Sequence, residues 1–248
     1  MHDDAIPAAT LVTMRASKAS GPPEILVVRR TARMAFAAGM IVFPGGRIDD
    51  ADRQLAEALG APDQAAQVTA IRETLEETGV AVALGAVDPL HALDLQALLL
   101  DGHSFPELVE RDGLAIDLGA LTPFARWKPA FKQPRKFDTL FLLAAAPPGD
   151  WRPRPQPGEC DAAEWASATA LLDRIAAGTE GAIFPTKRNL ERLARYPNHD
   201  EAVVDARRHS LETIVPWVEP IDGQDHVVIP EGRGYPVTSE PLTTAFRA

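Results

Sequence analysis

The chain has 248 residues, 46% of them hydrophobic, so it can bury a full core, and one domain with embellishments is the default expectation. Its formal net charge of −10 leaves no basic excess to neutralise a nucleic acid, but it allows a small phosphorylated substrate whose charge is met by divalent cations. The single Cys160, the absence of a signal-peptide pattern in residues 1–20 and the absence of a membrane-length apolar run favour a cytoplasmic protein without a membrane partner.

Two strands are predicted near the start, over residues 8–15 and 24–30, with a Ser-Gly-Pro-Pro turn between them. The second strand runs into a basic cluster that contains Arg29 and Arg33. These arginines are either solvated surface groups or ligands of substrate phosphate, to which arginine can form two parallel hydrogen bonds. We therefore name Arg29 and Arg33 as candidate substrate-binding residues.

A tight turn ending in Gly45 and Gly46 follows an apolar run, and its glycines allow backbone to approach an anionic ligand closely. A short helix is expected over residues 51–60, and a longer helix follows. In the longer helix, Asp63 is the expected N-cap, and Gly79 is placed to end it.

Three carboxylates, Glu73, Glu76 and Glu77, share the face of this helix opposite its apolar stripe. At this spacing they repel one another unless a cation lies among them. A solvated acidic face is the alternative, but Glu76 and Glu77 lie in the last turn, where the helix dipole disfavours negative charge. The pattern therefore favours a site for a hard cation such as Mg²⁺ or Mn²⁺.

The remaining elements are expected as a mixture of strands and helices. Strands are predicted over 80–84, 121–128, 137–144, 161–165, 211–218 and 226–229, helices over 90–100, 106–112, 167–176, 184–195 and 201–208, and no regular element after residue 230. Between two of the strands, basic and aromatic side chains are interleaved. They form either a solvated hairpin face or a platform for a base and phosphate, so we name Lys132, Arg135 and Lys136 as substrate-binding candidates.

The glycine turn and the acidic helix resemble the Nudix box. Its pattern is Gly, five residues, Glu, seven residues, and then Arg-Glu-aliphatic-any-Glu-Glu-any-Gly-aliphatic. The second half is matched by Arg72, Glu73, Glu76, Glu77, Gly79 and Val80, with Thr74 at a usually aliphatic position. Counting back from Arg72 puts the first glutamate position at Gln64, 18 residues after Gly46, so about 12 residues are inserted.

The resemblance implies an α/β (α+β) fold, the Nudix α/β/α sandwich with a mixed central sheet. We expect one domain over residues 1–248, with a core over about 6–195 and a helical, loop-rich C-terminal extension over about 196–248. The tail can also take part in homodimer contacts.

The family's chemistry is divalent-metal-dependent hydrolysis of the pyrophosphate in a nucleoside diphosphate derivative, with Mg²⁺ or Mn²⁺ as the cofactor. The resemblance makes Glu76 and Glu77 the main metal ligands and Glu73 a further ligand or the catalytic base. Arg72 would orient Glu73, and Gly46 would let the loop pass close to the substrate.

In Nudix enzymes the loop before residue 161 often supplies one more acidic group, and Glu159, Asp161 and Glu164 remain open as candidates. The insertion and several flanking segments resemble the peroxisomal-type coenzyme A diphosphatases. That subgroup implies cleavage of coenzyme A or an acyl derivative to 3′,5′-ADP and a phosphopantetheine. The alternatives are a pyrophosphatase for ADP-ribose, NADH or a dinucleoside polyphosphate, a non-catalytic nucleotide sensor on the same scaffold, and a protein-interaction module.

Overall fold

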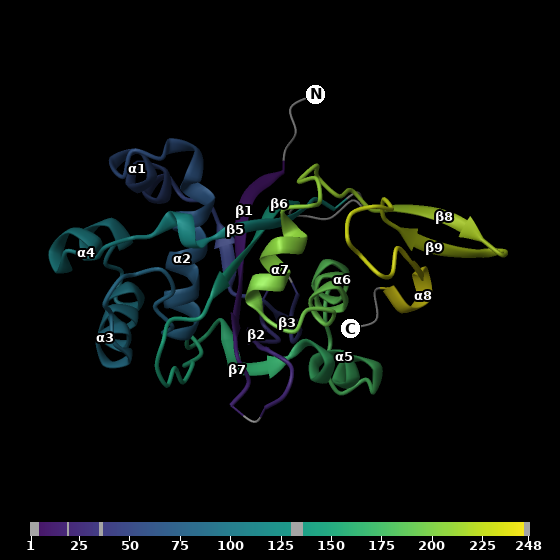
Figure 1. Ribbon diagram of the computed structural model, residues 1–248, viewed down its shortest axis with the longest axis horizontal. Helices are drawn as coiled ribbons and strands as arrows, with labels where there is room; N and C mark the ends of the chain where they lie inside the picture. Colours follow the sequence, from purple (N-terminus) through teal and green to yellow (C-terminus); the bar gives the residue numbers. More distant parts are fainter. Residues whose placement is uncertain (1–4, 19, 35–36, 130–135, 246–248) are drawn as a thin grey trace.

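The computed structural model describes residues 5–18, 20–34, 37–129 and 136–245. In them a mixed sheet lies between two groups of helices, which confirms the predicted α/β/α sandwich (Figure 1). The first group comprises α1 (Asp50–Ala58), α2 (Ala65–Thr78), α3 (Pro89–Leu100) and α4 (Phe105–Asp112). The second comprises α5 (Ala168–Ala176), α6 (Phe184–Leu193) and α7 (His199–Ala206). None of the helices in the described ranges combines the length and the apolar character needed to cross a bilayer.

The central sheet has the strand order β3-β2-β1-β6-β5, with β4 added beside β1 and β7 beside β2. Its strands are β1 (Ile6–Arg15), β2 (Glu24–Arg30), β3 (Ile41–Val42), β4 (Gly45–Arg47), β5 (Thr122–Trp127), β6 (Phe137–Ala145) and β7 (Cys160–Ser167). Strands β1 and β6 are parallel, and the other pairs between these strands are antiparallel. The sheet is therefore mixed, as predicted.

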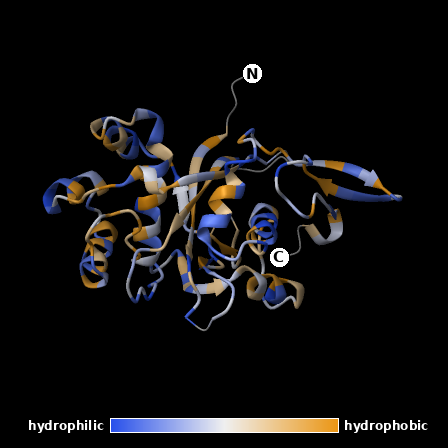
Figure 2. Ribbon diagram, viewed as in Figure 1, coloured by the Kyte–Doolittle hydropathy of each residue, from blue (hydrophilic) through white to orange (hydrophobic). Residues whose placement is uncertain are grey.

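Strand β1 shows how the sequence builds two cores. Ala9 and Leu11 are buried against the helices of the first group, whereas Val12 and Met14 are buried against those of the second. The alternation follows from the two-residue period of a strand that is covered on both faces. Figure 2 shows the hydrophobic residues of these central strands lying between the helices.

Two expectations in this half of the chain were wrong. Residues 80–84 form no strand, because Val80, Val82 and Leu84 are buried among α2, α3 and α4, so their apolar pattern reflects burial rather than pairing. Asp63 is not the N-cap of the acidic helix, since it lies in a 3₁₀ turn and α2 begins at Ala65.

The C-terminal extension is more ordered than the sequence indicated. A second, three-stranded sheet is formed by β8 (Trp217–Ile221), β9 (Gln224–Val228) and β10 (Ser239–Pro241), and a short helix, α8 (Leu242–Ala245), follows it. The prediction of no regular element after residue 230 was therefore wrong. One reason is tertiary: Glu240 of β10 accepts hydrogen bonds from Lys187 and Arg188 of α6 at 2.5 and 2.8 Å, a contact that no local pattern reveals.

Candidate active site

A cavity of about 860 Å³ lies beside the acidic face of α2. One side of it is polar and is lined by Arg72, Glu73, Glu76 and Glu77 of α2, together with the glycine turn at β4 and the loop before β7. Strands β1, β5 and β6, the start of α6 and two residues of the C-terminal extension also line it, together with residues of β2, β3 and the chain beside them. The size falls within the range of small-molecule sites.

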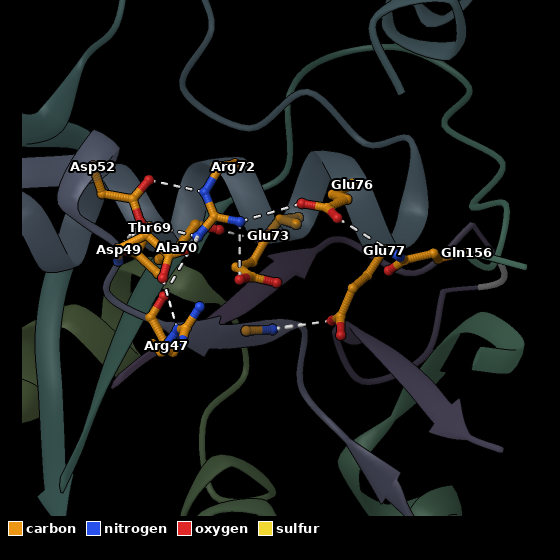
Figure 3. A network of polar contacts seen from close by, with 12 residues as sticks. Arg47, Asp49, Asp52, Thr69, Ala70, Arg72, Glu73, Glu76, Glu77 and Gln156 are labelled. Atoms are coloured by element: carbon orange, nitrogen blue, oxygen red, sulfur yellow. Dashed lines mark hydrogen bonds and ion pairs between the residues drawn. The ribbon is translucent and has the colours of Figure 1, made fainter. Parts of the chain in front are cut away.

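Arg72 is the centre of a polar network on this side (Figure 3). Its Nη1 lies 3.0 Å from Glu73 Oε1 and 3.2 Å from Glu76 Oε2. On its other side, Nε and Nη2 donate to the two carboxylate oxygens of Asp52 at 2.8 and 2.9 Å. Arg72 thus holds two of the box glutamates in place while a carboxylate outside the helix holds Arg72.

The first acidic position of the interrupted box is Asp52, so its assignment to Gln64 was wrong. Counting forward from Gly46, five residues intervene before Asp52, which is the spacing of the first acidic position of the pattern. The structure places Asp52, and not Gln64, against Arg72. The inserted residues therefore lie between Asp52 and Arg72, where α1 and the 3₁₀ turn accommodate them.

The Asp52 side chain is fully buried, and its carboxylate is saturated with hydrogen bonds. Besides the two from Arg72, it accepts one from the Thr69 hydroxyl at 2.8 Å and one from the Asp49 backbone at 3.1 Å. The last of these belongs to the capping box at the start of α1, so the helix that carries part of the insertion also fixes Asp52, the residue that anchors Arg72.

Glu77 faces the glycine turn. Its carboxylate accepts a hydrogen bond from the Gly45 backbone at 3.0 Å and lies 3.9 Å from Arg30 Nη1, and its side chain is only 2% exposed. Gly46 lies against the neighbouring Glu73, because a Cβ at that position would collide with the Glu73 carboxylate. A side chain at this position would therefore displace the Glu73 carboxylate, and the approach of the turn to a ligand stays a prediction.

The ionised form of each of the three glutamates is destabilised in the folded protein. Burial raises the pKa of Glu73 to about 7, with the charge of Glu76 adding to the rise and Arg72 opposing it. Burial also raises the pKa of Glu76 against the opposing effect of Arg72. The pKa of Glu77 is raised well above its usual range by burial and by Glu73, although Arg30 and the Gly45 amide oppose this. Clustered hard oxygen donors with raised pKa values are a donor set that a divalent cation would stabilise.

Among the residues that the structure describes, no three His, Cys, Asp or Glu side chains already converge as a metal site. The contacts explain this, since Glu73 and Glu76 are turned to Arg72, while Glu77 binds the Gly45 amide. The donor chemistry and the close approach at Gly46 nevertheless fit a cation held by these glutamates.

Several of the other candidate residues are placed away from the cavity. Arg29 donates to both carboxylate oxygens of Glu180, at 2.9 and 2.5 Å, and Arg33 is exposed; neither is among the residues that line the cavity. Lys136 is described but does not line it either. Lys132 and Arg135 lie outside the described residues.

The three acidic candidates downstream are separated by the structure. Glu159 lines the cavity. Asp161 is exposed, and Glu164 pairs with Arg174 at 2.9 Å, so neither belongs to the cavity lining.

Three residues of this side were not singled out from the sequence: Asp52, Arg30 and Gln156. Gln156 is buried, its side chain donates to Glu76 Oε1 at 3.4 Å, and its backbone donates to the Glu77 carbonyl at 3.1 Å. Arg30 lines the cavity, and its buried Nε has no hydrogen-bond partner among the described residues. Forward counting from Gly46 would have found Asp52, whereas no sequence signal marks Gln156.

No protein-family model and no curated protein matches the sequence. Among solved structures, a Nudix hydrolase from Alicyclobacillus acidocaldarius is 35% identical, covering 82% of this chain and 97% of that chain with a TM-score of 0.70.

Two further solved structures match more weakly. A MutT protein from Methanosarcina mazei Go1 is 15% identical over 79% of this chain and 96% of its own, with a TM-score of 0.45. A protein from Deinococcus radiodurans is 18% identical over 77% and 83%, with a TM-score of 0.42. The assignment depends on the first relative alone: the chain belongs to the Nudix hydrolase family and is a Nudix pyrophosphohydrolase.

Proposed function

We propose that this enzyme hydrolyses the diphosphate of a nucleoside diphosphate derivative with the help of a divalent cation, Mg²⁺ or Mn²⁺. Glu73, Glu76 and Glu77 would hold the cation. The observation that carries the proposal is the face of α2 on which these three carboxylates line one cavity, with Arg72 as a single guanidinium between two of them. Nudix hydrolases in general use divalent metals, which agrees with this donor set.

When bound, the cation would neutralise charge on the phosphoryl oxygens and lower the pKa of an attacking water. The chain's own groups have separate tasks. Glu73 is either a further ligand of the cation or the base that takes up the proton of the water, and burial raises its pKa to about 7 in the protein without metal. Arg72 keeps the Glu73 and Glu76 carboxylates oriented, and Asp52 keeps Arg72 oriented. Glu159 is the downstream acidic group that this geometry favours as a further ligand or base.

Binding of the diphosphate itself calls for cations on the polar side of the cavity. Arg30 is suited to this task because its buried Nε is unpartnered among the described residues and its Nη1 is near Glu77. Arg47 and Lys128 also line the cavity. Arginine and lysine at such positions can bind phosphate oxygens as the diphosphate approaches the metal.

For the substrate we propose coenzyme A or an acyl-coenzyme A, cleaved to 3′,5′-ADP and a phosphopantetheine. The size of the cavity and its combination of acidic, basic and apolar sides support a long substrate with one charged and one less polar end. ADP-ribose, NADH and dinucleoside polyphosphates are the competing substrates.

The experiment is phosphate-coupled hydrolysis with Mg²⁺ or Mn²⁺ of coenzyme A, acetyl-coenzyme A, ADP-ribose, NADH and diadenosine tetraphosphate. We expect turnover that EDTA abolishes and that is highest for the coenzyme A compounds. Preference for another compound would overturn the coenzyme A proposal and leave the metal-dependent chemistry intact. Tight nucleotide binding without turnover of any compound would instead favour the sensor.

A further inference from the structure

Part of the cavity lining is built from two parallel strands. Residues that share one face of β1 and β6 line it as registered pairs: Ile6 beside Phe137, Ala8 beside Thr139 and Thr10 beside Phe141. Phe43 packs edge-on to Phe141, with ring centroids 6.3 Å apart. This floor is mostly apolar, so it offers little to a diphosphate or a sugar.

The apolar floor continues into an aromatic wall around Trp127 at the end of β5. Trp127 also lines the cavity, and its ring packs edge-on against Phe184 and Tyr235, with centroid separations of 6.1 and 5.4 Å. Trp127 and Phe184 are only 2% and 4% exposed. The wall is therefore packed in place before any ligand arrives.

The C-terminal segment, residues 214–245, completes this wall. Its Pro216 and Ala245 line the same cavity as the glutamates of α2. The segment is joined to the edge of β5 by backbone hydrogen bonds on both sides of Trp127, from Ile214 N–H to the Arg126 carbonyl at 2.7 Å and from Lys128 N–H to the Ile214 carbonyl at 3.0 Å.

Buried side chains fasten the segment as well. The Trp127 indole N–H donates to the Tyr235 hydroxyl at 2.9 Å, and that hydroxyl donates to Asn189 Oδ1 of α6 at 2.8 Å. Tyr235 is not among the residues that line the cavity, so we expect it to act on a ligand through Trp127, which does line it.

We propose that the C-terminal segment is a specificity element that makes the cavity a two-part site. The carboxylate side takes the diphosphate, and the aromatic wall takes an unbranched apolar group attached beyond the second phosphate. Tyr235 is a positioning residue that acts through Trp127. The inference rests on the proposed diphosphate hydrolysis, but it does not depend on coenzyme A as the natural substrate.

A homologous series of probes tests it: the methyl, butyl and octyl esters of ADP on its terminal phosphate. Water adds to one phosphorus, the bridging P–O bond breaks, and the products are AMP and an alkyl phosphate. A buried methylene contributes about 0.8 kcal/mol, so kcat/KM should rise up to about fourfold per methylene from the methyl to the butyl ester. This rise in kcat/KM should come mainly from a lower KM.

Tyr235→Phe keeps the ring and removes the hydroxyl that fastens Trp127. We expect kcat/KM for the butyl and octyl esters to fall about threefold to tenfold, and that for the methyl ester to change less than about twofold. Tyr196→Phe is the matched control, because its hydroxyl is also partly buried and hydrogen-bonded near α6, to Asp205, but it lies outside the cavity. It should lower the melting temperature and keep the dependence on chain length.

Ala245→Leu is a second variant, which enlarges a side chain of the wall directly. It should reduce turnover of the octyl ester more than that of the methyl ester. Equal kcat/KM for the three esters in the wild-type enzyme, or turnover of the nucleotide panel but of no ester, would overturn this inference alone. Absence of turnover of both the panel and the esters would overturn the proposed hydrolysis as well.

Discussion

The side-chain clusters around Arg72 and Arg192 differ in charge balance. Arg72 contacts the carboxylates of Asp52, Glu73 and Glu76 within 3.2 Å, and its side chain is 12% exposed toward the cavity. Arg192 is 1% exposed and donates to Asp205 at 2.9 Å and to the Phe124 carbonyl at 3.1 Å. Around Arg72, three carboxylates surround one guanidinium, whereas Arg192 is matched by the single carboxylate of Asp205.

The pKa directions express the same contrast. Burial and neighbouring carboxylates raise the pKa of Glu73, so part of its charge is unfavourable in the folded state. For Asp205, burial would raise the pKa, but hydrogen bonds from Tyr196 and Arg192 more than offset this and lower it. A cluster in which carboxylate charge exceeds basic charge indicates a site that binds a charged ligand. A cluster in which the charges balance indicates a structural role. The predictions below test this distinction.

The largest effect is expected for Glu76→Gln. Loss of a carboxylate proposed as a metal ligand should lower kcat/KM by more than about a hundredfold, beyond the range typical of outer-shell residues. Stability should be unchanged or slightly raised, because a repulsive charge is removed. Steady-state kinetics with Mg²⁺ and thermal unfolding would measure both.

The control for this variant is Glu191→Gln, since Glu191 is also partly buried and pairs with Arg188 at 2.8 Å on the structural side of the molecule. It should keep the activity of the wild type. Wild-type activity in Glu76→Gln would contradict the site assignment.

Arg192→Met should have the next largest effect, on the free energy of unfolding. It leaves Asp205 and the Phe124 carbonyl without their buried donor. Removing one partner of a buried ion pair costs about 3 kcal/mol of the free energy of unfolding. Because Asp205 is partly exposed, we expect the loss to be no larger than that. Urea unfolding measures it. Activity per folded molecule should persist, and a large kinetic defect with unchanged stability would reverse the assignment of this cluster.

Asp52→Asn should lower both kcat/KM and the free energy of unfolding, because Asp52 anchors Arg72 from outside α2. An amide can accept only part of the four hydrogen bonds that the carboxylate accepts, so Arg72 should lose its fixed orientation. We expect kcat/KM to fall about tenfold to a hundredfold, which is typical of second-shell partners. An unchanged kcat/KM would show that Arg72 is held adequately by the glutamates alone.

The smallest effect is a pH dependence of stability without metal. Since the folded pKa of Glu73, about 7, exceeds its unfolded value, its contribution to stability is complete at pH below about 4.5 and is lost as the pH rises through about 7. EDTA-treated protein should therefore lose on the order of 2 kcal/mol between pH 5 and pH 8 from this group. Urea titrations at several pH values would measure the slope.

Glu73→Gln supplies the comparison for that slope. It should reduce the slope between pH 5 and pH 8, with Glu76 and Glu77 supplying the rest, and Mg²⁺ should restore the stability of the wild type at pH 8. An identical slope in wild type and variant would show that Glu73 is not the titrating group.

Much of the molecule could be predicted without coordinates. The stripe of α2 and the stop at Gly79, whose φ of 67° suits glycine, are local features, and the resemblance to the Nudix box that they carry implied the correct fold. One of the failures was also local. The apolar residues 80–84 are buried as an irregular segment, and neither helix nor strand periodicity distinguishes that case from a strand.

What the sequence by itself determined is the acidic face of α2 and the Nudix box, because residues three or four apart on a helix have fixed relative positions. Tertiary structure alone decided the contacts from Glu76 to Gln156 and from Trp127 to Tyr235, which are separated by 80 and 108 residues. It also decided that Arg30 and not Arg29 lines the cavity. Side chains adjacent in a strand point to opposite faces, so only the packing of the sheet determines which of the two meets a ligand.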